Sequence, residues 1–224
     1  MIKRCIIFDN EDQSESILKL VRDGKHIGIE IECEQFNVGS TELTEVLTNG
    51  EIDIEKVVKE FSNRFSTKTF HLAAFDWQLD DKIDGVELIR QLTHYRILKN
   101  TPKIIFSGLL GDILKDILKS GDNKSQNKLT TLVNGDIKGF FKREKYDNDI
   151  LNILSTSDES VELIIEEELK KFPGLIFKNS FISKKFNGKT FLEIAEFLKD
   201  NDSMRNEFKK EIIQQVIAYL TEKI

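Results

Sequence analysis

The sequence predicts an α/β fold in which helices cover a parallel sheet. Between residues 3 and 150, short apolar runs alternate with stretches of helical periodicity, an alternation that is typical of parallel sheets. In addition, four apolar runs stop abruptly at a polar residue: CIIF at Asp9-Asn10, HLAAF at Asp76, KIIF at Ser107 and GFF at Lys142. Open parallel sheets bind ligands outside the carboxyl ends of their strands, so these polar residues predict a functional site.

The first part of the chain is expected to form two strands around a helix. The continuous apolar run at 3–8 reads as a buried strand of a parallel sheet. Residues 13–23 place apolar side chains at helical spacing, and Gly24 is expected to end that helix. Residues 27–33 alternate between apolar and polar, which favours a strand with one wetter face near the edge of the sheet.

The middle of the chain continues the alternation after an irregular stretch. Residues 35–50 show only a short helical possibility around 43–47. A clear helix is predicted at 53–65, because its apolar residues share one face. A buried strand at 70–75 and, after a loop, a helix at 86–98 follow it.

The last strands of the predicted sheet lie between residues 103 and 141. A strand at 103–106 ends at Ser107, and a helix is expected at 109–119. The polar stretch GDNKSQNK then indicates a solvated loop, and Leu129–Val133 is a short apolar piece. A strand at 137–141 completes the alternating series, which implies a parallel sheet with helices over it.

After residue 150 the pattern changes to helical periods. Three amphipathic stripes are present, at 161–172, 194–198 and 208–220, and Thr190 and Glu193 have the spacing of a capping box ahead of the second one. The sequence therefore predicts a sheet domain at 1–150 and a helical region at 151–224. We expect this region to pack on the sheet domain or on a second copy of the chain.

Composition excludes several classes of protein. The net charge of −6 argues against a general nucleic-acid binder. There is no long uncharged apolar stretch, and no signal peptide is expected, because residues 3–8 already form a strand-like segment. Cys5 and Cys33 lie in apolar, strand-like segments without the spacing of a zinc site. They are interpreted as buried, reduced thiols of a cytoplasmic protein.

The residues at the strand ends suit one reaction, the reversible phosphorylation of Asp76. One or two carboxylates usually suffice to bind Mg²⁺, and Asp9 and Asp76 supply them. A carboxylate beside such a metal can act as a nucleophile toward a phosphoryl group. Lys142 would place a positive charge on the phosphoryl oxygens, and the Ser107 hydroxyl would donate a hydrogen bond.

These residues resemble the receiver domain of two-component response regulators. The closest match is FDWQLDDKIDGVELIRQL at residues 75–92, which is similar to the phospho-acceptor strand, the loop after it and the next helix. The resemblance covers residues 3 to 150 and implies a flavodoxin-like, doubly wound five-stranded parallel sheet of order 2-1-3-4-5. It makes Asp76 the phospho-acceptor, with Ser107 and Lys142 beside it. The implied Mg²⁺ ligands are Asp9, Asn10, Asp76 and the backbone carbonyl of Gln78.

The resemblance also implies partners and leaves alternatives open. It implies a sensor histidine kinase or phosphotransfer protein, a downstream protein partner and a possible homodimer, without membrane or nucleic-acid binding and without enzymatic turnover of its own. A pseudo-receiver that binds partners without phosphorylation is the main alternative, because Asn10 stands where the family carries its second acid. A Mg²⁺-dependent phosphatase at the same sheet edge is the third possibility.

Overall fold

The computed structural model of the protein describes residues 2–39, 46–109, 111, 123–156, 161–178, 184–200 and 202–221. The chain forms two compact units. The first comprises Met1–Ser66 and Phe70–Asp158, and the second comprises Thr67–Thr69 and Glu159–Ile224. Helix α6 (Tyr146–Thr156) belongs to the first unit. The functional division into 1–150 and 151–224 stays a prediction.

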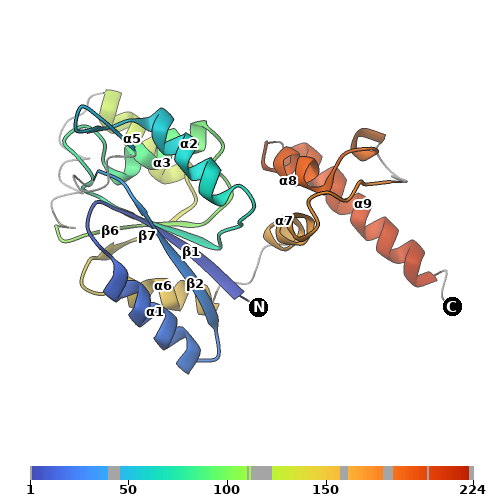
Figure 1. Cartoon of the computed structure of the whole chain (residues 1–224), viewed down its shortest axis with the longest axis horizontal. Coiled ribbons are helices and arrows are strands. Elements are labelled where there is room, and N and C mark those ends of the chain that lie inside the picture. Colours follow the sequence, from blue (N-terminus) through green and yellow to red (C-terminus); the bar gives the residue numbers. More distant parts are fainter. Residues whose placement is uncertain are drawn as a thin grey trace. The chain divides into compact units, whose positions relative to one another are not determined.

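The first unit is built on a five-stranded parallel sheet (Figure 1). Its strands are β1 (Ile2–Asp9), β2 (Glu30–Asn37), β5 (Leu72–Asp76), β6 (Lys103–Ser107) and β7 (Ile137–Lys142). They lie in the order β2-β1-β5-β6-β7, and every neighbouring pair is parallel. When the five strands of this sheet are numbered along the chain, their order is 2-1-3-4-5, so the predicted fold class is confirmed. All residues of β5 and β6 are buried, as continuous apolar runs require.

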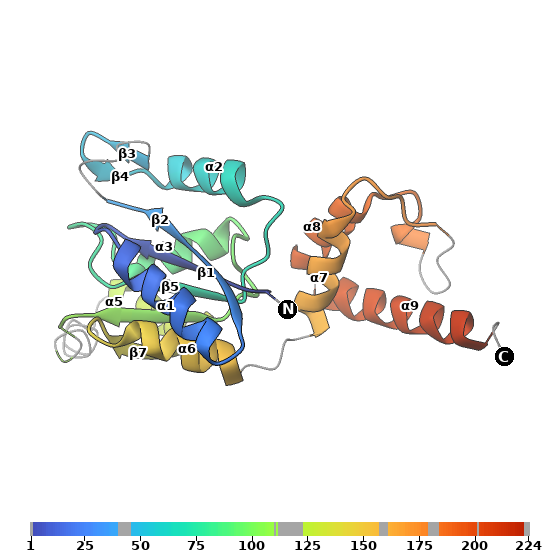
Figure 2. The same ribbon diagram turned by 60° about the horizontal axis from the view of Figure 1, so that its bottom comes forward.

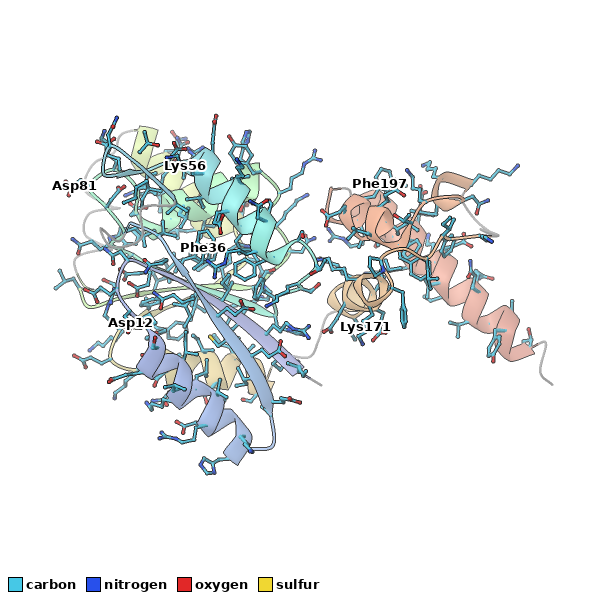
Figure 3. All side chains as sticks on the ribbon, viewed as in Figure 1. Asp12, Phe36, Lys56, Asp81, Lys171 and Phe197 are labelled. Carbon is cyan, nitrogen blue, oxygen red and sulfur yellow. The ribbon has the colours of Figure 1, made fainter. Side chains whose placement is uncertain are left out.

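Helices cover both faces of this sheet (Figure 1). One face carries α1 (Ser14–His26) and α6, which pack against each other. The other carries α2 (Ile54–Phe65), α3 (Gly85–His94) and α5 (Asn123–Asn134). Phe36 of β2 lies in the core between the sheet and α2, where Phe8 and Phe75 stack with ring centroids 4.5 Å apart (Figure 3). This aromatic packing fixes the strands whose ends form the site.

Local differences from the sequence expectations have clear physical reasons. Residues 47–52 form a short antiparallel hairpin, β3 (Leu47–Thr48) and β4 (Glu51–Ile52), where a helix was expected around 43–47. Asn49 and Gly50 form its turn with φ of 54° and 82°, the backbone that an Asn-Gly hairpin requires. That expected helix is wrong for Leu47, and residues 43–45 lie outside the described part of the chain.

Two further expectations are wrong in detail. Helix α1 does not end at Gly24 but continues to His26. A Cβ on Gly24 would lie 2.5 Å from Ile31 Cδ1, so this glycine permits close packing of α1 on β2. The polar stretch expected to be a loop already belongs to α5 from Asn123 onward, because a helix with a polar face needs few apolar residues. The helix predicted at 109–119 lies almost wholly outside the described residues.

The second unit is helical, as predicted for the tail (Figure 2). It contains α7 (Val161–Lys171), a 3₁₀ turn at Lys184–Phe186, α8 (Phe191–Asp200) and α9 (Asp202–Thr221). Its core is formed by Leu169, Phe177, Phe186, Ile194, Ala195, Leu198, Met204 and Phe208. The predicted capping box is confirmed, because the Thr190 backbone N–H donates to Glu193 Oε2 and the Glu193 N–H donates to Thr190 Oγ1. Among the described helices, none has both the length and the apolar character needed to span a bilayer.

Candidate functional site

The predicted strand-end residues meet at one edge of the sheet. Asp9 is the last residue of β1, Asp76 of β5, Ser107 of β6 and Lys142 of β7. In the ladder Phe8 pairs with Phe75, and Ser107 pairs with Lys142, so these ends are level with one another. The apolar strands keep both acids inside, with Asp9 0% and Asp76 2% exposed.

An open, acidic pocket of about 490 Å³ lies at this edge. Its walls are formed by Asn10, Glu11, Asp76, Gln78, Leu79, Asp80, Asp81, Ser107, Gly108, Leu109 and Arg143. Four of the six predicted site residues therefore line the pocket, and Asp9 contacts Arg143, which also lines it. Lys142 does not line it: its side chain is exposed, and no ion pair of this lysine occurs within the described part of the chain.

Arg143 is the cation that reaches the acids, and the sequence analysis missed it. Its Nη2 lies 2.6 Å from Asp76 Oδ2, while its Nη1 lies 2.6 Å from Glu11 Oε2 and 3.5 Å from Asp9 Oδ2. The Arg143 backbone N–H donates to the Ser107 carbonyl at 3.1 Å, which fixes the start of this side chain. One guanidinium thus bridges three carboxylates, a geometry that its fork of N–H donors suits.

The pairing between β6 and β7 explains why Arg143 and not Lys142 faces the site. The ladder shifts register near its start, because Lys103 pairs with Ile137 but Ile104 pairs with Gly139. Successive strand residues face opposite sides of a sheet, so one extra residue decides which neighbouring side chain turns toward the site. Lys142 and Arg143 are adjacent in the sequence, which indicates that either one could supply the positive charge of the site.

Burial dominates the electrostatics of the two acids. It raises the pKa of Asp9 to about 6, while a hydrogen bond from the Glu11 backbone lowers it and the charge of Asp76 raises it further. Burial also raises the pKa of Asp76, and the charge of Arg143 opposes this shift. Burial thus disfavours the ionised form of both carboxyl groups, and the guanidinium between them opposes this effect.

The Asp9 and Asn10 side chains are already engaged in hydrogen bonds. Asp9 accepts from the Glu11 N–H at 2.9 Å and from Gln13 Nε2 at 2.8 Å. Asn10 Nδ2 donates to the Leu79 carbonyl at 3.0 Å. Within the described residues, no cluster of three or more His, Cys, Asp or Glu side chains could hold a metal ion. With Arg143 between the acids, the residues as arranged do not fit a Mg²⁺ site.

The loop after Asp76 is tied to the hairpin β3–β4. Asp80 Oδ1 accepts from the N–H groups of Lys82 and Ile83, and its Oδ2 accepts from the Ile52 N–H at 3.0 Å. Lys82 also pairs with Glu51 at 2.5 Å. Asp81, within this loop, lines the acidic pocket and is marked in Figure 3. The pocket wall is therefore anchored to a hairpin that lies outside the parallel sheet.

Two residues at the start of α3 place the end of β5. Asp84 caps the helix by accepting from the Glu87 N–H at 2.9 Å, and it pairs with Lys128 of α5. A Cβ on Gly85 would lie 2.3 Å from the Asp76 carbonyl oxygen, so only glycine permits this approach. The Lys128 Nζ lies 5.2 Å from the centre of the Trp77 ring. Trp77 is the single Trp of the chain and follows Asp76 directly, so its fluorescence can report on the site.

No family model and no curated protein matches the chain. Among solved structures, the N-terminal domain of a response regulator/sensory box/GGDEF 3-domain protein from Carboxydothermus hydrogenoformans is 12% identical, with 68% of this chain and 91% of that chain covered and a TM-score of 0.40. The signal receiver domain of a modulated diguanylate cyclase from Desulfovibrio desulfuricans is 14% identical, with 76% and 98% covered and a TM-score of 0.38. The response regulator RcsB from Salmonella typhimurium is 15% identical, with 94% and 90% covered and a TM-score of 0.39.

These similarities concern the fold alone. The strand order β2-β1-β5-β6-β7 stands on the geometry of the first unit itself, and further helices follow this unit in the chain.

Proposed function

We propose that this chain is a receiver-like signalling protein in which Asp76 accepts a phosphoryl group and Arg143 neutralises the charge beside it. The observation that carries this proposal is the 2.6 Å contact between Arg143 Nη2 and Asp76 Oδ2 at the wall of an open pocket. A phosphoryl group adds negative charge next to a buried carboxyl group. A guanidinium stabilises such charge through directed, charge-assisted hydrogen bonds.

The proposed step is a displacement at phosphorus. A carboxylate oxygen of Asp76 attacks the phosphorus of a donor, an O–P bond forms, and the leaving group departs with the electrons of its own bond to phosphorus. Ser107 supports this step. Its Oγ accepts from the Leu109 N–H at 3.0 Å, which leaves the hydroxyl proton to donate into the pocket. Lys142 remains a prediction for a second cation.

Arg143 occupies the place between the acids that a bound Mg²⁺ would need. The resemblance assigns this ion to Asp9, Asn10, Asp76 and Gln78, where it would neutralise charge. Because Arg143 already supplies a positive charge there, we assign charge compensation to this residue and not to the ion. Removal of Arg143 should then improve Mg²⁺ binding, which makes the two cations experimentally separable.

The partners follow from the same chemistry. The phosphoryl donor is proposed to be a sensor histidine kinase or a phosphotransfer protein of the cytoplasm, and the output a protein–protein contact with a downstream partner or a second copy. The chain itself would then turn over no substrate beyond its own phosphorylation and dephosphorylation.

A pseudo-receiver is the second candidate function, and one observation favours it. The contacts of Arg143 already offset part of the negative charge of Asp9 and Asp76 without a ligand. In that case the fold would bind partners in a single state, and Asp76 would serve only the internal ion pair.

Intact mass of the full chain separates these candidates. We expect incubation with a small phosphoryl donor, such as acetyl phosphate, to add one phosphoryl group to the wild type and none to Asp76→Asn. Lys142→Met should keep most of the modification, whereas Arg143→Met should lose most of it. No added mass with or without Mg²⁺, either with this donor or with a phosphorylated histidine phosphotransfer protein, would leave the pseudo-receiver. Release of phosphate from free phosphoesters would instead indicate a phosphatase.

A further inference from the structure

The two cysteines of the chain lie side by side on neighbouring parallel strands. Cys5 of β1 and Cys33 of β2 are direct partners in the ladder. Neighbouring strands are about 4.8 Å apart, and disulfides span Cα separations of roughly 4.4–6.8 Å. Both side chains pack in the same cluster, under α1 and α6, so they project from the same face of the sheet. The neighbouring Cys33 thiol adds to the effect of burial in raising the pKa of Cys5.

The two thiols differ in access, which gives each a different chemical part. Cys33 is half-buried on β2, which is an edge strand of the sheet. Cys5 is 0% exposed on the neighbouring strand. A small oxidant can therefore reach the sulfur of Cys33 first, and Cys5 is the buried thiol next to Cys33. Burial raises the pKa of the Cys5 thiol, which keeps that group protonated and unreactive toward external oxidants.

We propose that Cys33 and Cys5 form a reversible disulfide when hydrogen peroxide oxidises Cys33. The Cys33 sulfur attacks one peroxide oxygen, the O–O bond breaks, and one water leaves as Cys33 becomes a sulfenic acid. The Cys5 sulfur then attacks the Cys33 sulfur, its S–H proton leaves with the displaced hydroxyl group, and a second water forms. Two thiols and one peroxide thus give one disulfide and two waters, and a dithiol reductant reverses the change.

The position of this link connects it to the acidic site. Cys5 precedes Asp9 on β1, and Cys33 precedes Gln35 on β2. The Gln35 side chain accepts from the Gln13 N–H at 2.9 Å and donates to the Glu11 carbonyl at 2.6 Å. The disulfide would therefore join the two strands that hold the Asp9 end of the site. The formation of this disulfide does not require phosphorylation of Asp76.

Mass spectrometry of the full-length chain tests the proposal. We expect peroxide treatment, followed by blocking of free thiols, to give a monomer that has lost two hydrogens and takes up no blocking reagent. Digestion should yield the Cys5–Cys33 linked peptide, and dithiothreitol should restore both thiols. The assignment is unambiguous because the chain contains only two cysteines.

Variants assign the order of the two steps. Cys33→Ser should abolish the loss of two hydrogens, and Cys5→Ala should instead accumulate a Cys33 sulfenic acid that dimedone traps. Circular dichroism of both variants checks that they fold. The proposal is wrong if peroxide leaves both thiols of the wild type free to react, if Cys33 proceeds to a sulfinic acid while Cys5 stays reduced, or if the linked species is a dimer on a non-reducing gel.

Discussion

Replacement of Arg143 by methionine removes the positive charge that the buried carboxylates share, while it keeps an apolar side chain over the Phe106 ring, which lies 5.5 Å from the guanidinium carbon. Loss of one partner from a buried ion pair costs about 3–5 kcal/mol. Arg143 is 28% exposed in its pair with Asp76, so solvent screens part of the interaction. We therefore expect the free energy of unfolding of the first unit to fall by about 2–3 kcal/mol at pH 8.

The loss of stability in this variant should depend on pH, whereas a packing defect would destabilise the protein equally at every pH. The folded-state pKa of Asp9 is raised from 3.8 to about 6, so the ionised form opposes folding, and wild-type stability falls as pH rises from about 4 to 6. This shift alone corresponds to about 3 kcal/mol. Without Arg143 the folded-state pKa rises further, and the variant should continue to lose stability between pH 6 and 8. At pH 5 protonation relieves the site, and the cost should shrink to about 1 kcal/mol.

Urea unfolding at pH 5, 6, 7 and 8, followed by Trp77 fluorescence, measures these differences. The matched control is Lys142→Met, which should stay within about 0.5 kcal/mol of the wild type at every pH, because this side chain is exposed. Added Mg²⁺ at ten times its dissociation constant should restore about 1.4 kcal/mol to the Arg143 variant, and less to the wild type. Equal, pH-independent effects of the two substitutions would refute the assignment of Arg143 as the cation of this site.

Other substitutions test the frame around the site and the second unit by urea unfolding. Lys103 is 1% exposed, and burial lowers its pKa to about 8, so wild-type stability should rise between about pH 8 and 10. Lys103→Met should stabilise the chain by about 1–3 kcal/mol at pH 7 and below, and the gain should shrink as the pH rises toward 10. Gly85→Ala should cost about 1–3 kcal/mol and reduce phosphorylation of Asp76, because the new Cβ would lie 2.3 Å from the Asp76 carbonyl. Gly108→Ala, with nothing within 4 Å of its Cβ, should be nearly neutral. Thr190→Ala should destabilise the second unit by about 1 kcal/mol through loss of the helix cap.

The sequence was most informative where burial is continuous. In β1, β5 and β6 apolar residues run unbroken to the sheet edge, so the first polar residue marks the strand end and the predicted positions of Asp9, Asp76 and Ser107 agree with the structure. It was less informative for α1, where Leu18 has helical spacing but is 71% exposed. Periodicity predicts a helix more reliably than it predicts which apolar residue of that helix the protein buries.

The hairpin at 47–52 and the placement of Arg143 were not predicted. The first depends on very short strands, and the second depends on pairing between distant parts of the chain. The Asn49-Gly50 turn was a visible hairpin signal, but its strands have two residues each and show no alternation. The place of Arg143 depends on a register shift between strands that are far apart in the chain. Such a shift follows from tertiary packing and leaves no local pattern in the sequence.

The attachment of Asp80 to the hairpin has a consequence for regulation from outside the sheet. Asp80 lines the acidic pocket and also accepts the Ile52 N–H of β4. A protein that binds the hairpin and displaces Ile52 is then expected to change the free energy with which an ion or group binds in the pocket. Because linkage is reciprocal, any ion or group bound in the pocket changes the affinity for that protein by the same factor. We expect this coupling to act at the hairpin itself, without any change transmitted across the sheet.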